Sequence, residues 1–398
     1  MLKGKKIILG ICGGIAAYKS VELLRLLTKS GADVHVIMTR AAREFVAPLT
    51  FQTLSMNPVH TDLFNLISEQ EIGHISLADR ADLFVVAPAT ANIIGKVAAG
   101  IADDMLTTTI MATKAPVLFA PAMNVNMYTN PLYQENEQKL RRLGYLFEAP
   151  VSGTLACGWE GEGKLASPEA IFESAISALT EKKLAGRTIM VTAGPTREEI
   201  DPVRYISNHS SGKMGYALAC EARRRGARVL LISGPTALPA PGGVSVVNVT
   251  SAIEMQSEVM ARAAECDVVI KAAAVADYRP LARSGTKIKK KGESSVIELV
   301  KNPDILAGLG SLETRPFLVG FAAETDALAE NAAKKLKEKN LDMIVANDVT
   351  QADAGFNVDT NRARFFFRDG SGSESGLMSK NQLAGVILDH VAAHLESR

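Results

Sequence analysis

Four segments in the first half of the chain place glycines or hydrogen-bonding side chains directly after apolar runs. They are GICGGIAAY (10–18), MTR (38–40), PATAN (88–92) and PAMNVNMY (121–128). In the first, Gly13 and Gly14 form a tight turn before a helix, where backbone N–H groups can bind a phosphate. The polar side chains that the others offer are those of Thr39, Thr90, Asn92 and Asn124. Turn formation explains each segment taken alone, but the four together predict a small-molecule site.

Two further residues of this half could transfer protons. Cys157 lies between Ala156 and Gly158 in a glycine-rich stretch, an unusual place for a cysteine that only packs, because free cysteines are usually buried. A thiol with a pKa of roughly 8.5 suits a proton donor or nucleophile. His74 precedes the predicted strand 83–87 and is as consistent with a surface histidine as with a base.

The second half contains SSGKMG (210–215) and the lysine run KIKKK (287–291). The first resembles a P-loop only superficially, because Met214 stands where magnesium binding needs Ser or Thr. No acidic residue follows the strands 33–38 and 227–233 to bind a ribose, which argues against an NAD dehydrogenase. A lysine run is usually a solvated surface, but Lys287 and Lys289 would point together if the segment is extended.

Apolar runs that alternate with helical patterns predict the elements that position these residues. In the first half the strands are 5–12, 33–38, 83–87 and 116–120; in the second they are 187–194, 227–234, 267–274, 317–323 and 342–348. This alternation is typical of parallel sheets with right-handed crossovers. We therefore expect two doubly wound α/β domains, 1–185 and 186–398, joined by EKKLAG (181–186). The glycine-rich residues 150–165 are predicted to form a loop.

Composition excludes several functional classes. Of the 398 residues 47% are hydrophobic, and 44 basic residues face 43 acidic ones, so the chain lacks the positive field of a nucleic-acid binder. Four separated cysteines without a CxxC pair argue against a zinc ribbon or a disulfide framework. The longest uncharged stretch, 115–134, contains three prolines, which excludes a membrane helix. We expect a cytoplasmic protein with no membrane or nucleic-acid partner.

Longer motifs in both halves resemble known families. GGIAAYK (13–19), PATAN with AAGIADDMLT (98–107), PAMNVNMY and ACGWEGEGKL (156–165) are similar to the flavin-containing cysteine decarboxylases. The motifs TAGPTREEIDPVRYISNHSSGKMGYALA (192–219), KAAAVADYRP (271–280), KNPDIL (301–306), GFAAET (320–325) and ANDV (346–349) resemble phosphopantothenate–cysteine ligase. The order of the halves is that of the bifunctional enzymes of coenzyme A biosynthesis.

For the first half, the resemblance implies a flavodoxin-like domain that binds FMN and decarboxylates phosphopantothenoylcysteine. It assigns FMN binding to Gly13, Thr39, Pro88, Ala89, Thr90 and Asn92. It gives His74 a part in oxidising the thiol end of the substrate, Asn124 the carboxylate that leaves, and Cys157 the donated proton. Tyr128 departs from the tryptophan expected in many relatives.

For the second half, the resemblance implies a Rossmann-like domain that joins 4'-phosphopantothenate to L-cysteine through an acyl cytidylate. It assigns CTP to Lys271, Ala272, Ala273, Asp277, Lys287, Pro303, Asp304, Ile305, Leu306, Phe321, Lys335 and Lys339. Arg204 and Asn208 would position phosphopantothenate and the acyl intermediate, and Lys287 would contact the nucleotide or the activated acyl group. Mg2+ would stabilise the pyrophosphate leaving group, through ligands that the motifs do not identify.

The resemblance also implies a homo-oligomer, with a trimer-based assembly of the flavin domain and dimerisation of the ligase domain. Two alternatives remain at this point. A non-catalytic FMN-binding regulatory protein of the same fold could lack His74 or Cys157, and both are present. A flavin-dependent peptidyl-cysteine decarboxylase would not need the ligase half.

Overall fold

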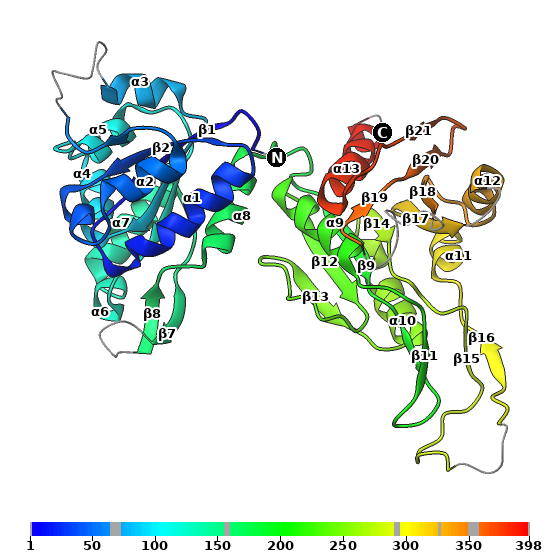
Figure 1. The fold of residues 1–398 in the computed structure, drawn as a ribbon. Helices are drawn as coiled ribbons and strands as arrows, with labels where there is room; N and C mark the ends of the chain where they lie inside the picture. Colours follow the sequence, from blue (N-terminus) through cyan, green and yellow to red (C-terminus); the bar gives the residue numbers. More distant parts are fainter. Residues whose placement is uncertain are drawn as a thin grey trace. The chain divides into compact units, whose positions relative to one another are not determined.

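The computed structural model describes residues 2–63, 73–154, 160–289, 295–324, 328–348 and 358–396. The chain forms two compact units, Met1–Thr180 and Glu181–Arg398. Each is built around its own sheet, with helices on both faces (Figure 1). The predicted fold class, two doubly wound and mostly parallel-sheet domains, is confirmed.

The sheet of the first unit is parallel throughout its six strands, in the order β3-β2-β1-β4-β5-β6. The strands are β1 (Lys6–Ile11), β2 (Asp33–Met38), β3 (Val59–His60), β4 (Leu83–Ala89), β5 (Val117–Pro121) and β6 (Leu146–Phe147). The side chains of β1 alternate between two cores, with Ile7 and Leu9 on one face and Ile8 on the other. Because both faces are buried, the strands are nearly continuous apolar runs.

Helices cover both faces of this sheet. They are α1 (Lys19–Lys29), α2 (Pro48–Ser55), α3 (Gly73–Arg80), α4 (Ala91–Ala99), α5 (Met105–Ala112), α6 (Val125–Tyr128), α7 (Pro131–Arg142) and α8 (Pro168–Leu179). Leu23, Leu24 and Leu27 of α1 are buried against one face, as the helical spacing predicts. Helices α4, α5 and α7 contribute to the core on the other face.

The glycine-rich residues 150–165 contain a hairpin, so the predicted loop was wrong for most of this segment. Strands β7 (Val151–Thr154) and β8 (Glu160–Lys164) pair antiparallel, and residues 155–159 between them lie outside the described residues. Gly161 and Gly163 let β8 lie directly on the 123–125 turn. A Cβ on Gly161 would be 2.7 Å from Cγ2 of Val125, and one on Gly163 would be 2.4 Å from the Met123 carbonyl oxygen.

The second unit has an eight-stranded sheet in the order β13-β12-β9-β14-β17-β18-β20-β21. Its strands are β9 (Thr188–Ala193), β12 (Arg228–Ser233), β13 (Ser245–Asn248), β14 (Val268–Lys271), β17 (Phe317–Glu324), β18 (Met343–Asp348), β20 (Arg364–Phe367) and β21 (Gly372–Glu374). The first six strands in that order are parallel, and β20 and β21 add an antiparallel edge.

Helices α9 (Lys213–Arg224) and α13 (Lys380–Glu396) pack on one face of this sheet. On the other face are α10 (Ala252–Arg262), α11 (Ile305–Gly310) and α12 (Leu328–Glu338). The short strands β19 (Thr360–Asn361) and β22 (Met378–Ser379) pair with each other.

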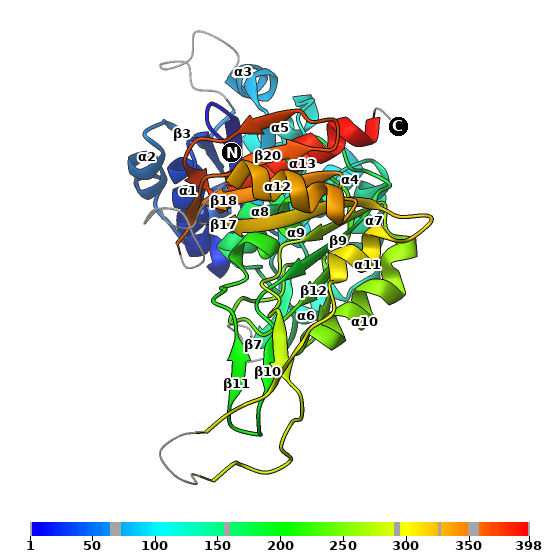
Figure 2. The same ribbon diagram turned by 90° about the vertical axis from the view of Figure 1, so that its right-hand side faces the viewer.

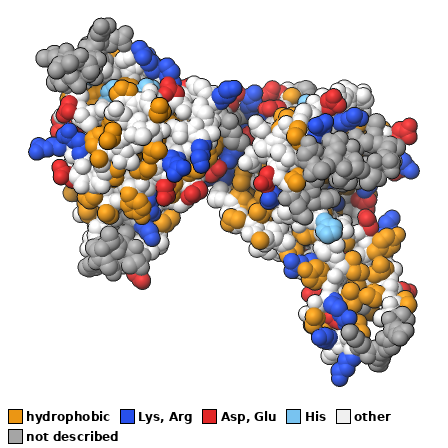
Figure 3. Space-filling model, viewed as in Figure 1, with side chains coloured by type: hydrophobic (Ala, Val, Ile, Leu, Met, Phe, Trp, Pro, Cys, Tyr) orange, Lys and Arg blue, Asp and Glu red, His pale blue; other side chains and the backbone are white. Residues whose placement is uncertain are grey.

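Two ribbons extend from this unit and form a feature that we call the arm, residues 197–207, 278–289 and 295–301. It contains β10 (Arg197–Glu199) paired with β11 (Tyr205–Ser207), and β15 (Tyr278–Pro280) paired with β16 (Leu299–Lys301) (Figures 1 and 2). Apolar side chains gather on its surface (Figure 3). Those exposed are Val203, Tyr205, Tyr278, Leu281, Ile288, Val296, Ile297 and Leu299.

Candidate functional sites

The first unit has a cavity of about 900 Å³ at the carboxyl ends of β1, β2, β4 and β5. The predicted residues that line it are Gly13, Thr39, Thr90, Asn92 and Asn124. The strand order places β1, β2, β4 and β5 side by side, which is why segments far apart in sequence meet here.

Gly13 fits a close approach of the backbone. A Cβ there would lie 2.4 Å from Cβ of Ala41 and 2.8 Å from its carbonyl carbon, whereas a Cβ on Gly14 would meet nothing within 4 Å. Thr39 caps the next turn by accepting a hydrogen bond from the Ala42 N–H at 3.3 Å. The two segments thus form a narrow wall of backbone and hydroxyl groups.

At the carboxyl ends of β4 and β5, the residues that form the turn also line the cavity. Thr90 is the N-cap of α4 and accepts a hydrogen bond from the Ile93 N–H, while Asn124 caps α6 through the Asn126 N–H. Both residues line the cavity as well. Their role in local structure therefore does not remove them from the candidate site.

Pro88 and Ala89 do not line this cavity. Both are buried in β4, and their carbonyl oxygens accept hydrogen bonds from the Cys12 and Ala122 N–H groups. Sequence reasoning missed Cys12, which does line the cavity. Burial raises the pKa of this thiol to about 12, so it stays protonated near neutral pH. Its position directly before Gly13 was the available signal.

The two proposed proton-transfer residues of this half are not brought together by the described residues. His74 is in the first turn of α3 and does not line the cavity. Its Nδ1 atom is buried and has no hydrogen-bond partner among the residues described. Cys157 lies outside the described residues.

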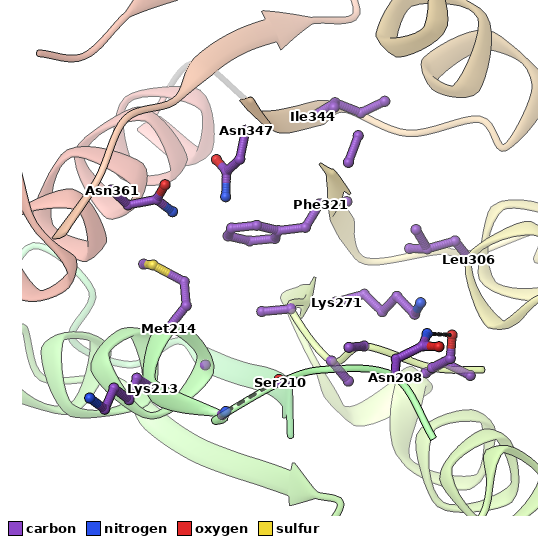
Figure 4. Close-up of a pocket in the computed structure, with 18 of the residues that line it drawn as sticks. Asn208, Ser210, Lys213, Met214, Lys271, Leu306, Phe321, Ile344, Asn347 and Asn361 are labelled. Carbon is purple, nitrogen blue, oxygen red and sulfur yellow. Dashed lines mark hydrogen bonds between the residues drawn. The ribbon is translucent and has the colours of Figure 1, made fainter. Parts of the chain in front are cut away.

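The second unit has a cavity of about 320 Å³ between the start of α9 and the ends of β14, β17 and β18 (Figure 4). The predicted residues that line it are Asn208, Lys271, Ala272, Ala273, Asp277, Leu306, Phe321, Lys335 and Lys339. Asn208 donates a hydrogen bond to the Val275 carbonyl at 3.0 Å. Three of the predicted lysines therefore converge on one cavity, Lys271 from the end of β14 and Lys335 and Lys339 from the end of α12.

We call Lys271, Lys335 and Lys339 the lysine wall. Burial and neighbouring charges act together on the pKa of Lys271 and on that of Asp304. Burial, with the nearby Lys339 ammonium, lowers the pKa of Lys271 to about 8. Lys339 itself forms an ion pair with Asp304 at 2.8 Å. Burial opposes ionisation of Asp304, yet the hydrogen bond from Lys339 holds its pKa below the usual range. Pro303, Asp304 and Ile305 do not line the cavity, and Asp304 instead caps α11 through the Ala307 N–H.

Sequence reasoning missed several polar residues at the opposite end of this cavity. They are Ser210, Ser211, Lys213, Asn347, Asn361 and Lys380. In Figure 4 the Asn347 and Asn361 amides point toward the Phe321 ring, and Lys271 lies on the far side of that ring. The buried Asn347 Oδ1 atom has no partner in the part of the chain that the structure describes. The motifs SSGKMG and ANDV contained four of these residues.

Arg204 and Lys287 lie outside this cavity, on the arm. Arg204 forms an ion pair with the fully buried side chain of Asp201 and is itself half exposed. It also donates a hydrogen bond to the Ile288 carbonyl at 2.9 Å, next to Lys287. The structure thus brings the two residues into one neighbourhood, separate from the lysine wall.

No group of three or more His, Cys, Asp or Glu side chains among the described residues could hold a metal ion. No helix within them has the length and apolar character needed to cross a membrane.

Comparison with known proteins identifies both units. Residues 1–180 match the Flavoprotein family model, and residues 184–395 match the model for the DNA/pantothenate metabolism flavoprotein C-terminal domain. The coenzyme A biosynthesis bifunctional protein CoaBC of Vibrio cholerae serotype O1 is 51% identical over 390 residues, covering 97% of this chain and 98% of that one. CoaBC of Bacillus subtilis strain 168 is 49% identical over 397 residues, covering 99% and 98%.

A solved structure covers the second unit. The crystal structure of the C-terminal domain of a CoaBC protein is 45% identical, with a TM-score of 0.48, and covers 55% of this chain and 100% of that one. Two family models in this order, together with relatives about half identical over nearly the whole length, leave one assignment. The chain belongs to the CoaBC family of bifunctional coenzyme A biosynthesis proteins.

Proposed function

We propose that this chain catalyses two consecutive steps of coenzyme A biosynthesis, with one step in each unit. The second unit uses CTP to join 4'-phosphopantothenate to L-cysteine, and the first decarboxylates the resulting phosphopantothenoylcysteine with FMN. The observation that carries this proposal is the presence, in a CoaBC chain, of a separate cavity with hydrogen-bonding groups at the carboxyl ends of each sheet. A regulatory flavoprotein or a peptidyl-cysteine decarboxylase would leave the second cavity unexplained.

The first cavity fits FMN in size and chemistry. The close approach at Gly13 exposes backbone N–H groups to a phosphate, and Thr39, Thr90 and Asn92 add hydrogen-bonding groups along the wall. The large share of apolar lining suits a ring system. Bound FMN would supply a two-electron acceptor, which a β-thiol acid needs because loss of CO2 otherwise leaves an unstabilised carbanion.

The chain's own residues would bind and protonate the substrate. Asn124, at the end of β5, would hold the carboxylate that leaves. His74 would assist at the thiol end, and Cys157 would donate a proton to the enethiol formed after CO2 is lost. Strand β8, which comes after residue 157 in the sequence, packs on the Asn124 turn through a hydrogen bond from the Met123 N–H to the Gly163 carbonyl, 2.9 Å.

The second cavity suits a polyphosphate and an anhydride intermediate. Lys271, Lys335 and Lys339 would neutralise CTP and the leaving pyrophosphate, assisted by Mg2+. The carboxylate of phosphopantothenate would attack the α-phosphorus of CTP and displace pyrophosphate, which forms a mixed anhydride with CMP. The cysteine amine would then attack the acyl carbon of this anhydride and release CMP. Asn208, on the rim of this cavity, and Arg204 would orient the acyl group, and Lys287 would contact it or the nucleotide.

We further propose that the protein is a cytoplasmic homo-oligomer, with trimer contacts in the first unit and dimer contacts in the second. His74 lies away from the cavity of its own chain, and the arm carries Arg204 and Lys287 beside exposed apolar side chains. Analytical ultracentrifugation of the full chain measures the stoichiometry.

Mass spectrometry of the products tests the proposed function. The full chain with FMN, Mg2+, CTP, 4'-phosphopantothenate and L-cysteine should produce 4'-phosphopantetheine, CMP and CO2. Omission of CTP should abolish all products, whereas supplied phosphopantothenoylcysteine should still be decarboxylated. If the chain converts neither 4'-phosphopantothenate nor supplied phosphopantothenoylcysteine, the proposal is wrong.

A further inference from the structure

Asp201 accepts more hydrogen bonds than any other described side chain of the arm. Neither its residue type nor its place in the sequence marked it as a functional residue. Its carboxylate is fully buried although the surrounding arm is exposed. Oδ1 accepts hydrogen bonds from the Val203 and Arg204 N–H groups, both at 2.9 Å. Oδ2 accepts from Nε of Arg204 at 3.1 Å and from the Ile288 N–H at 3.1 Å. One carboxylate therefore joins segments 87 positions apart.

The joined segments carry the two arm residues of the proposed ligase reaction. Arg204 is fixed at its guanidinium by Asp201 and by the Ile288 carbonyl, and Lys287 directly precedes Ile288. A second connection lies nearby, since the Ser284 N–H donates to the Ile200 carbonyl at 3.0 Å. The arm thus holds Arg204 and the 284–288 segment as one piece around Asp201.

We propose that Asp201 is the positioning residue of the ligase reaction, which fixes Arg204 and Lys287 relative to each other. This inference rests on the proposed function. Asp201 does not line the cavity of the second unit, so it acts through the residues that it holds in place. Holding the Arg204 guanidinium and the backbone next to Lys287 in one geometry spares the reaction part of the entropy of ordering them.

The ionised carboxylate is what this arrangement requires. The hydrogen bond from Arg204 holds the pKa of Asp201 far below its usual range, helped by the backbone N–H donors of Val203 and Ile288. A neutral amide has one acceptor oxygen instead of two and presents an N–H2 group to the guanidinium. Asp201→Asn therefore breaks the connection while keeping the size of the side chain.

The test combines single and double variants of the full chain. Asp201→Asn should lower kcat/KM for 4'-phosphopantothenate about 10- to 100-fold, the range expected for mispositioned groups. The decarboxylation of supplied phosphopantothenoylcysteine, which the first unit catalyses, should not change. If Asp201 acts in part through Arg204, the loss in the Asp201→Asn/Arg204→Gln double variant should be smaller than the product of the two single losses.

Asp342→Asn is the matched control. Asp342 is also buried, accepts hydrogen bonds from Arg315 at 2.9 Å and from the Leu318 N–H at 2.8 Å, and lies outside the arm. It should lower the melting temperature without changing kcat/KM below that temperature. If Asp201→Asn fails to fold, Asp201→Glu keeps the charge but displaces both carboxylate oxygens by one methylene, and it should produce the same loss of ligation.

Three results would overturn the inference. They are a wild-type kcat/KM in Asp201→Asn, losses that multiply in the double variant, and full ligation by Asp201→Glu when Asp201→Asn cannot be assayed. Failure of the wild-type chain to ligate at all would instead refute the proposed function.

Discussion

The depressed pKa of Lys271 predicts that CTP binding takes up protons. Burial and the neighbouring Lys339 lower this pKa to about 8 in the free protein. At pH 8, about half of the Lys271 side chains are then neutral, and at pH 7 about one in ten. A bound polyphosphate favours the ammonium form and should return the pKa toward its ordinary value of about 10.4.

The size of the effect follows from linkage. CTP binding should take up about 0.5 proton at pH 8 and about 0.1 at pH 7. If only the protonated form of Lys271 binds CTP, the dissociation constant should rise about tenfold between pH 7 and pH 9. The sign is fixed by the lysine, because affinity is full below its free-state pKa and is lost as the pH rises through it.

Isothermal titration calorimetry in two buffers of different ionisation enthalpy measures the uptake directly. Lys271→Arg is the matched variant, since a guanidinium stays charged over this range. It should bind CTP with no uptake at Lys271, and the ionisation of CTP itself cancels in the comparison. Equal proton uptake by the wild type and Lys271→Arg at pH 8 would refute the reasoning.

Three further predictions concern the two proposed activities. Gly13→Ala should lose FMN absorbance because its methyl group clashes with the wall of the cavity, while Gly14→Ala, with open space around its Cβ, should stay yellow; equal FMN content in both would contradict this. Lys287→Gln should abolish phosphopantothenoylcysteine formation but leave decarboxylation intact, so a joint loss would refute the division of labour between the units. In anaerobic mixing with phosphopantothenoylcysteine, Cys157→Ser should release CO2 once and leave the flavin reduced, whereas His74→Asn should leave it oxidised; a Cys157→Ser variant that neither bleaches nor releases CO2 would place Cys157 at the oxidation step.

Sequence periodicity was sufficient to predict the elements that form the buried sheets. Strands such as β4 and β9 are apolar because both faces are covered. The carboxyl ends of β2, β4 and β5 bring Thr39, Thr90 and Asn124 to one cavity. The resemblance of motifs, and not periodicity, supplied Lys335 and Lys339 as ligand-binding residues. Both line the second cavity.

The features that could not be predicted from the sequence depend on contacts between residues far apart in the chain. Nothing near Asp201 in sequence indicates its bond to Ile288, because the partner is 87 positions away. Asp304 belongs to the KNPDIL motif, whose resemblance assigned it to CTP binding. Its side chain instead caps α11 and forms an ion pair with Lys339. The hairpin of β7 and β8 was missed because its glycines satisfy a tertiary contact, whereas turn propensity takes account only of local sequence.

The seating of β8 on the 123–125 turn limits how this part of the protein can vary. Gly161 and Gly163 approach Val125 and the Met123 carbonyl so closely that the smallest added side chain would lift the strand. Variation that reshapes this wall of the cavity is therefore confined to the facing turn and to Lys164, the residue next to Gly163 that also lines the cavity. A directed-evolution library for altered acyl substrates should keep both glycines fixed and randomise those neighbours.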